Sequence, residues 1–134
     1  MLSTMQDHPL TITDIFTYGR TVHAESTVAT FEGDSTRHAT FARVGERAER
    51  LAAALARLGI GAGDRVATYG WNSQEHLEAY FAVPCMGAVL HTLNIRLFPE
   101  QLVYIANHAE DKIVLVEDSL VPALAKVRAE LKTV

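Results

Sequence analysis

The sequence predicts an α/β fold, in which strands and helices alternate to form a mostly parallel sheet flanked by helices on both faces. A short N-terminal helix and a β-hairpin are expected to precede the sheet. Short runs rich in β-branched residues alternate with helical patterns beyond residue 58, which is typical of βαβ crossovers. The run "IVLV" at 113–116 is apolar on both faces, as expected of a central parallel strand. Hydrophobic residues form 49% of the 134 residues and charged residues 21%, which suits one globular domain.

The N-terminal part of the chain is expected to form an arm, a helix and a hairpin. Residues 1–10 are predicted to be a flexible arm. A helix then extends to about Val22 from a cap at Thr11 or Thr13. Its apolar side consists of Ile12, Ile15, Phe16 and Gly19. The segment "STVATFEGDSTRHATF" at 26–41 predicts two short strands around a turn at 32–34.

The clearest helix is predicted over 41–58. Its apolar stripe consists of Val44, Ala48, Leu51, Leu55 and Leu58. Glu46 and Arg50 are spaced for an ion pair on the opposite side, where acids interleave the arginines. This side therefore favours a solvent-exposed helix back over a basic recognition face. Gly45 inside the helix costs roughly 1 kcal/mol relative to alanine, and the sequence shows no reason for it.

The rest of the chain alternates between strands and helices. Strands are predicted at 65–69, 88–93 and 112–116, and helices over about 73–86, 99–108 and 121–131. Asn72 is expected to cap the first of these helices and Ser119 the last. Pro99 occupies the favoured first position of the second.

The stretch "RLGIGAGDRVATYGWN" at 57–72 places Gly59, Gly61 and Gly63 beside a strand, as a phosphate-binding loop would. A dinucleotide-binding loop follows a strand and precedes a helix, whose N-terminal amides receive the phosphate. Here the helix comes first, so the negative end of its dipole points at the glycines. Gly59 is therefore predicted to end the helix in a left-handed conformation, and the loop is predicted to be a turn.

Charge and cysteine content exclude several classes of protein. The net charge is -4 without a basic tract, which argues against nucleic-acid partners. Cys85 is the only cysteine, so neither an intrachain disulfide nor a cysteine-based metal site is expected. The six histidines include no pair at helical metal-binding spacing, and no metal site is assigned. No secretory signal and no apolar run of ~18 residues is found, so we expect a cytoplasmic chain without a membrane span.

Two residues after the first predicted strand of the sheet are candidates for substrate contacts. Trp71 and Asn72 follow the carboxyl end of the 65–69 strand, where open α/β sheets bind ligands. Trp71 suits a cleft wall and packing under the next helix equally well.

Three further candidates lie in and after the next strand. His91 suits a hydrogen-bonded core position better than a pocket. Asn94 suits a turn or cap, and a carboxylate such as Glu100 is favoured over a phosphate as partner of Arg96. No nucleophile with a matched base is found, so no catalytic residue is assigned.

The run "GDRVATYGWNSQEHLEAYFAVPCMGAVLHTLNIRLFPEQLVYIANHAEDKIVLVED" at 63–118 resembles the adenylate-forming acyl-CoA synthetases, in particular the bacterial medium- to long-chain fatty-acid–CoA ligases. The likeness extends from about Thr11 to Val134. It includes "GDRVA", "HLEAYFAVP", "MGAVLHTLN" and "IANHAED". Arg43 departs from the pattern, since an acid is usual in that capping turn, and this departure bears only on local helix stability.

The resemblance implies a full-length enzyme that activates a medium- or long-chain fatty acid with ATP and Mg²⁺, and then transfers the acyl group to coenzyme A. The phosphate loop and the C-terminal catalytic lysine of such enzymes are not recognised here, where the lysines are Lys112, Lys126 and Lys132. Residues 11–134 are therefore expected to be an incomplete part of the large N-terminal α/β domain. They would supply scaffold and a wall of the substrate cleft, with no cofactor bound to this chain and no activity of its own.

Two other interpretations stay open. The first is a non-catalytic self-association module, in which the arm at 1–10 and the open sheet edge hold another chain in a homodimer or larger species. The second is a free-standing flavodoxin- or receiver-like domain. Such a domain would have a glycine- or Ser/Thr-rich loop after a strand, and this sequence lacks one. A Ser/Thr/Gly-rich loop and a lysine encoded beyond Val134 would favour the ligase.

Overall fold

The computed structural model describes residue 4 and residues 7–134. The elements are α1 (Ile12–Val22), β1 (Thr27–Phe31), β2 (Thr36–Thr40), α2 (Phe41–Arg57), β3 (Arg65–Tyr69), α3 (Gln74–Cys85), β4 (Val89–Thr92), α4 (Pro99–Ala109), β5 (Ile113–Val116) and α5 (Val121–Ala125). Single 3₁₀ turns lie at Asp118–Leu120 and Arg128–Glu130. Half of the predicted arm at 1–10, namely residues 1–3 and 5–6, lies outside the described residues, so the arm stays a prediction.

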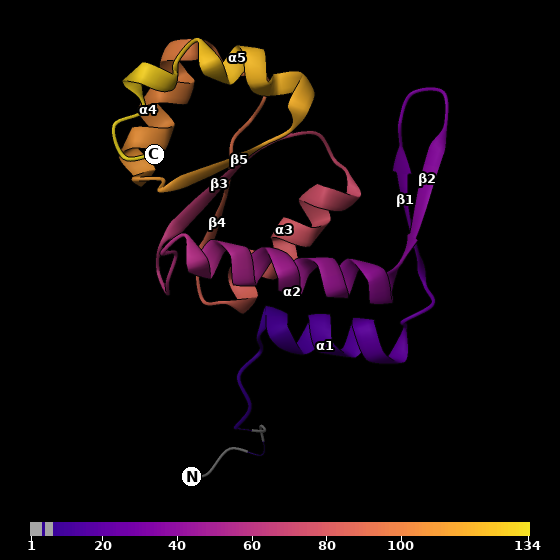
Figure 1. Cartoon of the computed structure of the whole chain (residues 1–134). Helices are drawn as coiled ribbons and strands as arrows, with labels where there is room; N and C mark the ends of the chain where they lie inside the picture. The colour runs from indigo at the N-terminus through magenta and orange to yellow at the C-terminus, as the bar shows by residue number, and fades with distance from the viewer. Residues whose placement is uncertain (1–3, 5–6) are drawn as a thin grey trace.

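The main sheet has three parallel strands in the order β4-β3-β5, which confirms the α/β class (Figure 1). Arg65 of β3 pairs with Val89 of β4, and Tyr69 pairs with Val116 of β5. The expectation that the 113–116 strand is central was wrong within this part of the chain. β5 is an edge strand with half-buried residues, and β3 is central, because the chain crosses over β3 between β4 and β5.

Helices cover both faces of this sheet, as predicted (Figure 1). α2 and α3 lie on one face, where Leu55 and Val83 pack against Val66 of β3. α4 and α5 lie on the other, where Leu102 and Leu124 pack against the next residue of β3, Ala67. Successive β3 side chains therefore point into two different cores. None of the helices in the described part of the chain is long and apolar enough to cross a membrane.

α1 forms a further layer against α2 and α3 (Figure 1). A Cβ at Gly19 would lie 2.7 Å from a ring carbon of Phe41, and a Cβ at Gly45 would lie 3.2 Å from Cβ of Arg20. This close helix contact is the reason for Gly45 that the sequence did not show. Of the predicted apolar side of α1, Ile12 and Ile15 are exposed and only Phe16 is buried.

Several local predictions are confirmed. Thr11 caps α1, and its hydroxyl accepts the N–H of Asp14. The two hairpin strands pair antiparallel, from Thr27 with Thr40 to Phe31 with Thr36. Gly59 has φ +87°, so the glycine stretch is a turn at the end of α2.

Three local predictions were wrong. Leu58 is 70% exposed, because the helix ends at Arg57 and the side chain leaves the apolar stripe. Ser73, and not Asn72, caps α3, since its hydroxyl accepts the N–H of His76 at 3.3 Å. A helix capped by Ser119 was expected over 121–131, but the observed helix α5 is only five residues long and Ser119 does not cap it. The side chains of Leu124, Val127 and Leu131 still reach the core, so packing holds the segment 121–131 in place without a continuous helix.

Candidate functional site

A cavity of about 620 Å³ opens at the carboxyl ends of β3 and β5. After β3 the chain turns to α3 on one face, and after β5 it turns to α5 on the other, which leaves a crevice between the two strand ends (Figure 1). Ligands of open α/β sheets bind at such points, where the strand order reverses. We call this hollow the β3–β5 cavity. It is lined by Thr30, Phe31, Glu32, Arg37, Thr68, Gly70, Trp71, Asn72, Ser73, Glu75, His76, Ala79, Leu115, Val116, Glu117 and Asp118.

Two of the five residues predicted from the sequence, Trp71 and Asn72, line this cavity. Trp71 is 52% exposed, and its indole N–H donates to the hydroxyl of Ser119 at 3.3 Å. The hydroxyl of Ser119 donates in turn to the carboxylate of Glu117. Trp71 therefore bridges the segments that follow β3 and β5. Whether Trp71 or Asn72 contacts a substrate stays a prediction.

His76 is a cavity residue that the sequence interpretation missed. Its Nδ1 lies 3.2 Å from the carbonyl oxygen of Trp71, and its Nε2 lies 3.0 Å from the hydroxyl of Thr68. A carbonyl oxygen only accepts, so Nδ1 carries the hydrogen and Nε2 accepts from Thr68 when the ring is neutral. The signal in the sequence was a histidine in the first turn of the helix that follows a strand.

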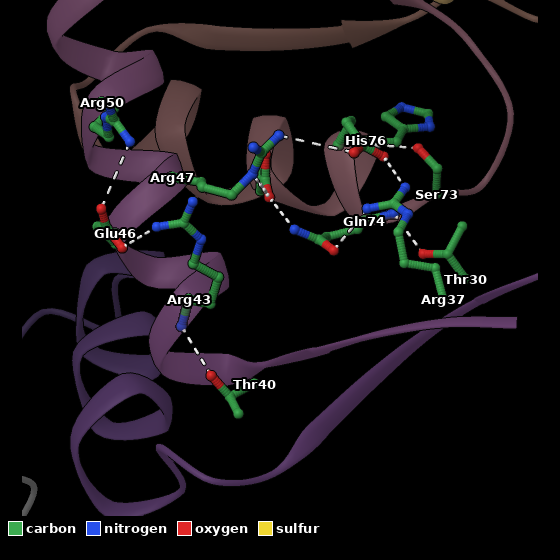
Figure 2. Close-up of polar contacts among 12 residues, drawn as sticks. Thr30, Arg37, Thr40, Arg43, Glu46, Arg47, Arg50, Ser73, Gln74 and His76 are labelled. Carbon is green, nitrogen blue, oxygen red and sulfur yellow. Dashed lines mark hydrogen bonds and ion pairs between the residues drawn. The ribbon is translucent and has the colours of Figure 1, made fainter.

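Arg37 of β2 joins the hairpin to α3 at the rim of the cavity. Its guanidinium lies 2.7 Å from the carboxylate of Glu32 and 2.9 Å from that of Glu75, and it donates to the side-chain oxygen of Gln74 at 2.9 Å. Figure 2 shows Arg37 pointing at the start of α3, next to Gln74 and Ser73. The hydrogen bond with Glu75, followed by that with Glu32, raises the pKa of Arg37. Burial pushes the pKa of Glu75 upward, but the hydrogen bond and charge of Arg37, together with the hydrogen bonds from the Glu75 N–H and from Ser73, outweigh burial, and the pKa is lowered.

A second part of the same network connects the start of α3 to Arg47 of α2 (Figure 2). Glu78 is nearly buried, and its carboxylate lies 2.6 Å from Nε of Arg47 on α2 and 2.7 Å from the amide nitrogen of Gln74. The backbone N–H of Gln74 donates to the hydroxyl of Thr30 at 3.0 Å. These contacts hold α2, α3 and the hairpin together, so the cavity wall is built on fixed elements.

The charges of the β3–β5 cavity do not suit the phosphates of ATP or coenzyme A. Four carboxylates lie along it, those of Glu32, Glu75, Glu117 and Asp118. Arg37 is the one Arg or Lys side chain among the lining residues, and two carboxylates already hold it. A phosphate would therefore meet more negative than available positive charge. Within residue 4 and residues 7–134, no three His, Cys, Asp or Glu side chains are grouped to hold a metal ion.

The other three predicted residues, His91, Asn94 and Arg96, lie outside the β3–β5 cavity. Nδ1 of His91 lies 2.9 Å from each carboxylate oxygen of the fully buried Asp111, so His91 is hydrogen-bonded but only partly buried, and a substrate contact by His91 stays a prediction. Burial raises the pKa of Asp111, and the hydrogen bond from His91 opposes this shift.

Asn94 forms a turn, since its side-chain oxygen accepts the N–H of Arg96 at 2.9 Å. Arg96 itself is exposed, and in the described part of the chain its guanidinium forms no ion pair with Glu100 or another carboxylate. The expected local partner of Arg96 is therefore not observed there.

A parallel sheet covered on both faces, with a cavity where its strand order reverses, is the arrangement in which α/β proteins bind small ligands. The sequence matches the family of AMP-binding enzymes over residues 19–134, and the chain belongs to this family. The predicted kinship with acyl-CoA ligases is thereby confirmed.

Individual relatives agree with this assignment. The chain is 47% identical over 133 residues to a long-chain-fatty-acid–CoA ligase of Thermus thermophilus, covering 98% of this chain and 25% of the relative. It is 40% identical over 136 residues to a medium-chain-fatty-acid–CoA ligase of Ectopseudomonas oleovorans, covering 100% and 25%. The crystal structure of the anthranilate CoA ligase AuaEII with anthranoyl-AMP superposes with a TM-score of 0.85 at 27% identity, covering 97% and 25%. The chain thus spans about a quarter of the length of these relatives.

Proposed function

We propose that residues 1–134 act as the N-terminal α/β part of an ATP-dependent fatty-acid–CoA ligase. In this reaction a medium- or long-chain fatty acid, ATP and coenzyme A give acyl-CoA, AMP and diphosphate through an acyl-adenylate, with Mg²⁺ as the metal ion. The identities of 47% and 40% to fatty-acid–CoA ligases support the substrate class. The cytoplasmic location stays a prediction from the sequence.

Within such an enzyme, this chain supplies scaffold and one wall of the substrate cleft. The observation that carries this role is the β3–β5 cavity, which lies at the reversal of strand order and is built on elements joined by the Arg37 and Glu78 contacts. Its acidic lining offers no site for the phosphates, so phosphate binding and the chemical step belong to residues beyond this chain. Walls that only orient the substrate still lower the barrier, because they restrict its motion before reaction.

A hybrid enzyme tests this proposal. Residues 1–134 replace the matching segment of the Thermus thermophilus ligase, and acyl-CoA and AMP are measured with fatty acids of eight to sixteen carbons. The expected result is acyl-CoA formation by the hybrid, and none by the Thermus ligase lacking that segment. The segment of the Ectopseudomonas ligase, inserted in the same way, is the matched control. A folded hybrid that forms no acyl-adenylate, beside an active control, would contradict the proposal.

A second candidate function is self-association, and the sheet edges favour it. β4 and β5 are the outer strands, so within the described residues each has one edge without a strand partner. Such edges pair with other chains. The expected result is a dimer or larger species of the 134-residue chain in light scattering, and a monomer at every concentration would contradict this function.

A further inference from the structure

The β3–β5 cavity presents two aromatic side chains that the described part of the chain leaves uncovered. Phe31, at the end of β1, is 74% exposed, and Trp71, after β3, is 52% exposed. Both line the cavity, whose volume of about 620 Å³ lies within the range of roughly 300–1,000 Å³ that is usual for binding sites. Exposed apolar surface gathered in a hollow and rimmed by polar groups marks an interaction site.

Trp71 is held in place without the use of its ring faces. Its backbone carbonyl lies 3.2 Å from Nδ1 of His76, and its indole N–H donates to the hydroxyl of Ser119 at 3.3 Å. The first contact is made by the backbone and the second by the edge of the ring. The face of an indole ring attracts cations, because its π-electrons carry partial negative charge. Trp71 is therefore a fixed aromatic surface that suits a cation.

Two carboxylates beside Trp71 add the charge that a cation needs. Glu117 and Asp118 directly follow β5, and a Cβ at Gly70 would lie 3.5 Å from Cβ of Glu117. One carboxylate oxygen of Glu117 accepts hydrogen bonds from the N–H and the hydroxyl of Ser119. Among the described residues, neither Glu117 nor Asp118 forms an ion pair.

The other two carboxylates of the cavity already hold a guanidinium. Glu32 and Glu75 lie 2.7 Å and 2.9 Å from the side chain of Arg37. Charge complementarity therefore favours a second guanidinium beside Trp71. This planar group stacks on an indole ring and donates two N–H groups to a carboxylate, whereas an ammonium group offers the charge without the planar shape.

The surroundings favour an arginine on a polypeptide over a small free cation. Phe31 and Leu115 add apolar lining that a guanidinium does not cover, but that the neighbours of an arginine in a peptide could cover. The hairpin next to the cavity has strand edges without a partner among the described residues, and such edges pair with extended segments. The chain spans about a quarter of the length of its relatives, so a ligase of that length has other segments to supply the arginine.

We propose that the β3–β5 cavity is a docking site for an arginine-bearing segment of the ligase outside residues 1–134, with the guanidinium on the ring of Trp71 and its N–H groups directed at Glu117 and Asp118. The docked segment fastens the rest of the enzyme to this chain and completes the wall that the chain begins. This inference rests on the proposed ligase function and adds to it the chemistry that joins the two parts.

Trp71 is the only tryptophan of the 134-residue chain, so its fluorescence reports on the cavity directly. The probes are the end-blocked tripeptide leucyl-arginyl-leucine, the same tripeptide with citrulline or lysine at the centre, and N-acetylarginine amide. We expect a saturable change of emission with the arginine tripeptide, and a Kd at least about tenfold higher with citrulline, an uncharged isostere. The lysine tripeptide and N-acetylarginine amide should also bind more weakly, and about 0.5 M NaCl should weaken arginine binding severalfold.

Matched variants test the two carboxylates and the apolar lining. Glu117→Gln combined with Asp118→Asn should weaken binding of the arginine tripeptide at least about tenfold and leave the citrulline tripeptide unaffected. Phe31→Ala should weaken the arginine tripeptide but not N-acetylarginine amide, which has no flanking leucines. Glu100→Gln removes a carboxylate of α4 outside the cavity, and this control should bind as the wild type does.

The hybrid with the Thermus ligase tests whether the ligase itself supplies the arginine. The double variant of Glu117 and Asp118 should lower the Tm of the hybrid more than the Tm of the isolated chain, because only the hybrid contains the docked segment. The difference should shrink in about 0.5 M NaCl, since salt screens the contact. Glu100→Gln should show no such difference. None of these measurements needs catalysis.

Three results would overturn the inference. They are a folded chain whose emission does not respond to the arginine tripeptide, binding of the citrulline tripeptide or N-acetylarginine amide as tight as that of the arginine tripeptide, and equal effects of the double variant on the hybrid and the isolated chain. Circular dichroism checks folding, and if the double variant unfolds, Asp118→Asn at an exposed position replaces it. An active hybrid without an arginine response refutes only this inference. A folded, inactive hybrid beside an active control refutes the proposed ligase function, and the titration still decides the arginine site.

Discussion

Gly59 shows how one residue shapes the chain next to the sheet. Its backbone has φ +87°, and an added Cβ would meet no atom within 4 Å. Substitution there therefore strains only the backbone. Gly61, two residues on, has no such positive φ, and an added Cβ would lie 3.9 Å from the carboxylate of Asp64. Substitution of Gly59 therefore tests the left-handed backbone conformation alone, and substitution of Gly61 serves as its control.

Gly59→Ala should lower the free energy of unfolding by about 1 kcal/mol, because alanine resists the left-handed conformation. Gly61→Ala, the matched control, should leave stability unchanged or raise it slightly. Chemical denaturation of both variants measures the difference. Equal stability of the two variants would contradict the role of Gly59 as the helix-ending residue.

Two aspartates at the main sheet carry pKa shifts of opposite sign. Burial raises the pKa of Asp111, against the hydrogen bond from His91. The hydrogen bond with Lys112, followed by that from the N–H of Gly61, lowers the pKa of Asp64. For Asp111 the folded state binds the proton more tightly, so its contribution to stability falls as pH rises from the unfolded value through the raised pKa. For Asp64 the contribution is present above the unfolded pKa and is lost as pH falls through the lowered pKa.

Asp111→Asn and Asp64→Asn should therefore change stability with opposite pH trends. Relative to wild type, the Tm of Asp111→Asn should rise as the pH rises above 3.8, the ordinary aspartate pKa, and through the raised pKa of Asp111, since the ionisation that costs stability is removed. The relative Tm of Asp64→Asn should fall as the pH rises from the lowered pKa of Asp64 to the ordinary value of 3.8, since a favourable carboxylate is lost. Thermal melts across pH measure both. Parallel trends in the two variants would show that the stated causes are wrong.

At the scale of elements, close contacts and one ion network arrange the helices around the cavity. α1 approaches α2 because Gly19 and Gly45 lack side chains. Phe41 fills the space over Gly19 and packs edge-on against Phe81 of α3. Arg37 ties the hairpin to the start of α3. The hairpin and α1 are thus held mainly by contacts with the helices that carry the cavity wall.

Gly19→Ala should destabilise the protein, although alanine favours helix by up to 1 kcal/mol relative to glycine. The new Cβ would lie 2.7 Å from the Phe41 ring, which cannot move freely beside Phe81. Thr17→Ala, at an exposed position of the same helix, is the control and should not lower the Tm. A Gly19→Ala variant as stable as Thr17→Ala would mean that α1 shifts away without cost.

For the whole molecule, the charge of the cavity predicts what the chain cannot do alone. Adenylation builds up charge on the leaving diphosphate and needs cations and N–H donors fixed around it. Among the residues that line the β3–β5 cavity, Arg37 is the one Arg or Lys side chain, and two carboxylates hold it. Catalysis therefore requires groups from elsewhere.

The 134-residue chain should catalyse no fatty-acid-dependent exchange between ATP and pyrophosphate. ATP with Mg²⁺ should also leave its Tm unchanged, because stabilisation requires a ligand concentration above the dissociation constant. Radioactive exchange and thermal shift measure the two effects. Exchange activity that copurifies with the chain, and is lost in a point variant of it, would refute the scaffold role.

Much of the local structure could be predicted because its causes lie within short stretches of chain. The cap at Thr11, the hairpin turn and the helix end at Gly59 depend on side-chain oxygens and glycines a few residues from the groups they affect. Helix and strand periods depend on neighbours within one or two turns. The family was also evident from the sequence, since the residues that carry the resemblance are contiguous.

Contacts between residues far apart in sequence were decided only by the tertiary structure. The edge position of β5, the pairing of His91 with Asp111 and the joining of Trp71 to Ser119 each link segments at least 20 residues apart. The role of His76 was missed for a different reason: Thr68 lies only eight residues earlier, but on the preceding strand, and periodicity does not show how the turn between strand and helix brings the two side chains together. Sequence periodicity describes which face of an element is buried, but not which element covers it. The position of the cavity beyond the 65–69 strand was expected, but the parts of its lining that come from the hairpin and from the end of β5 could therefore not be predicted.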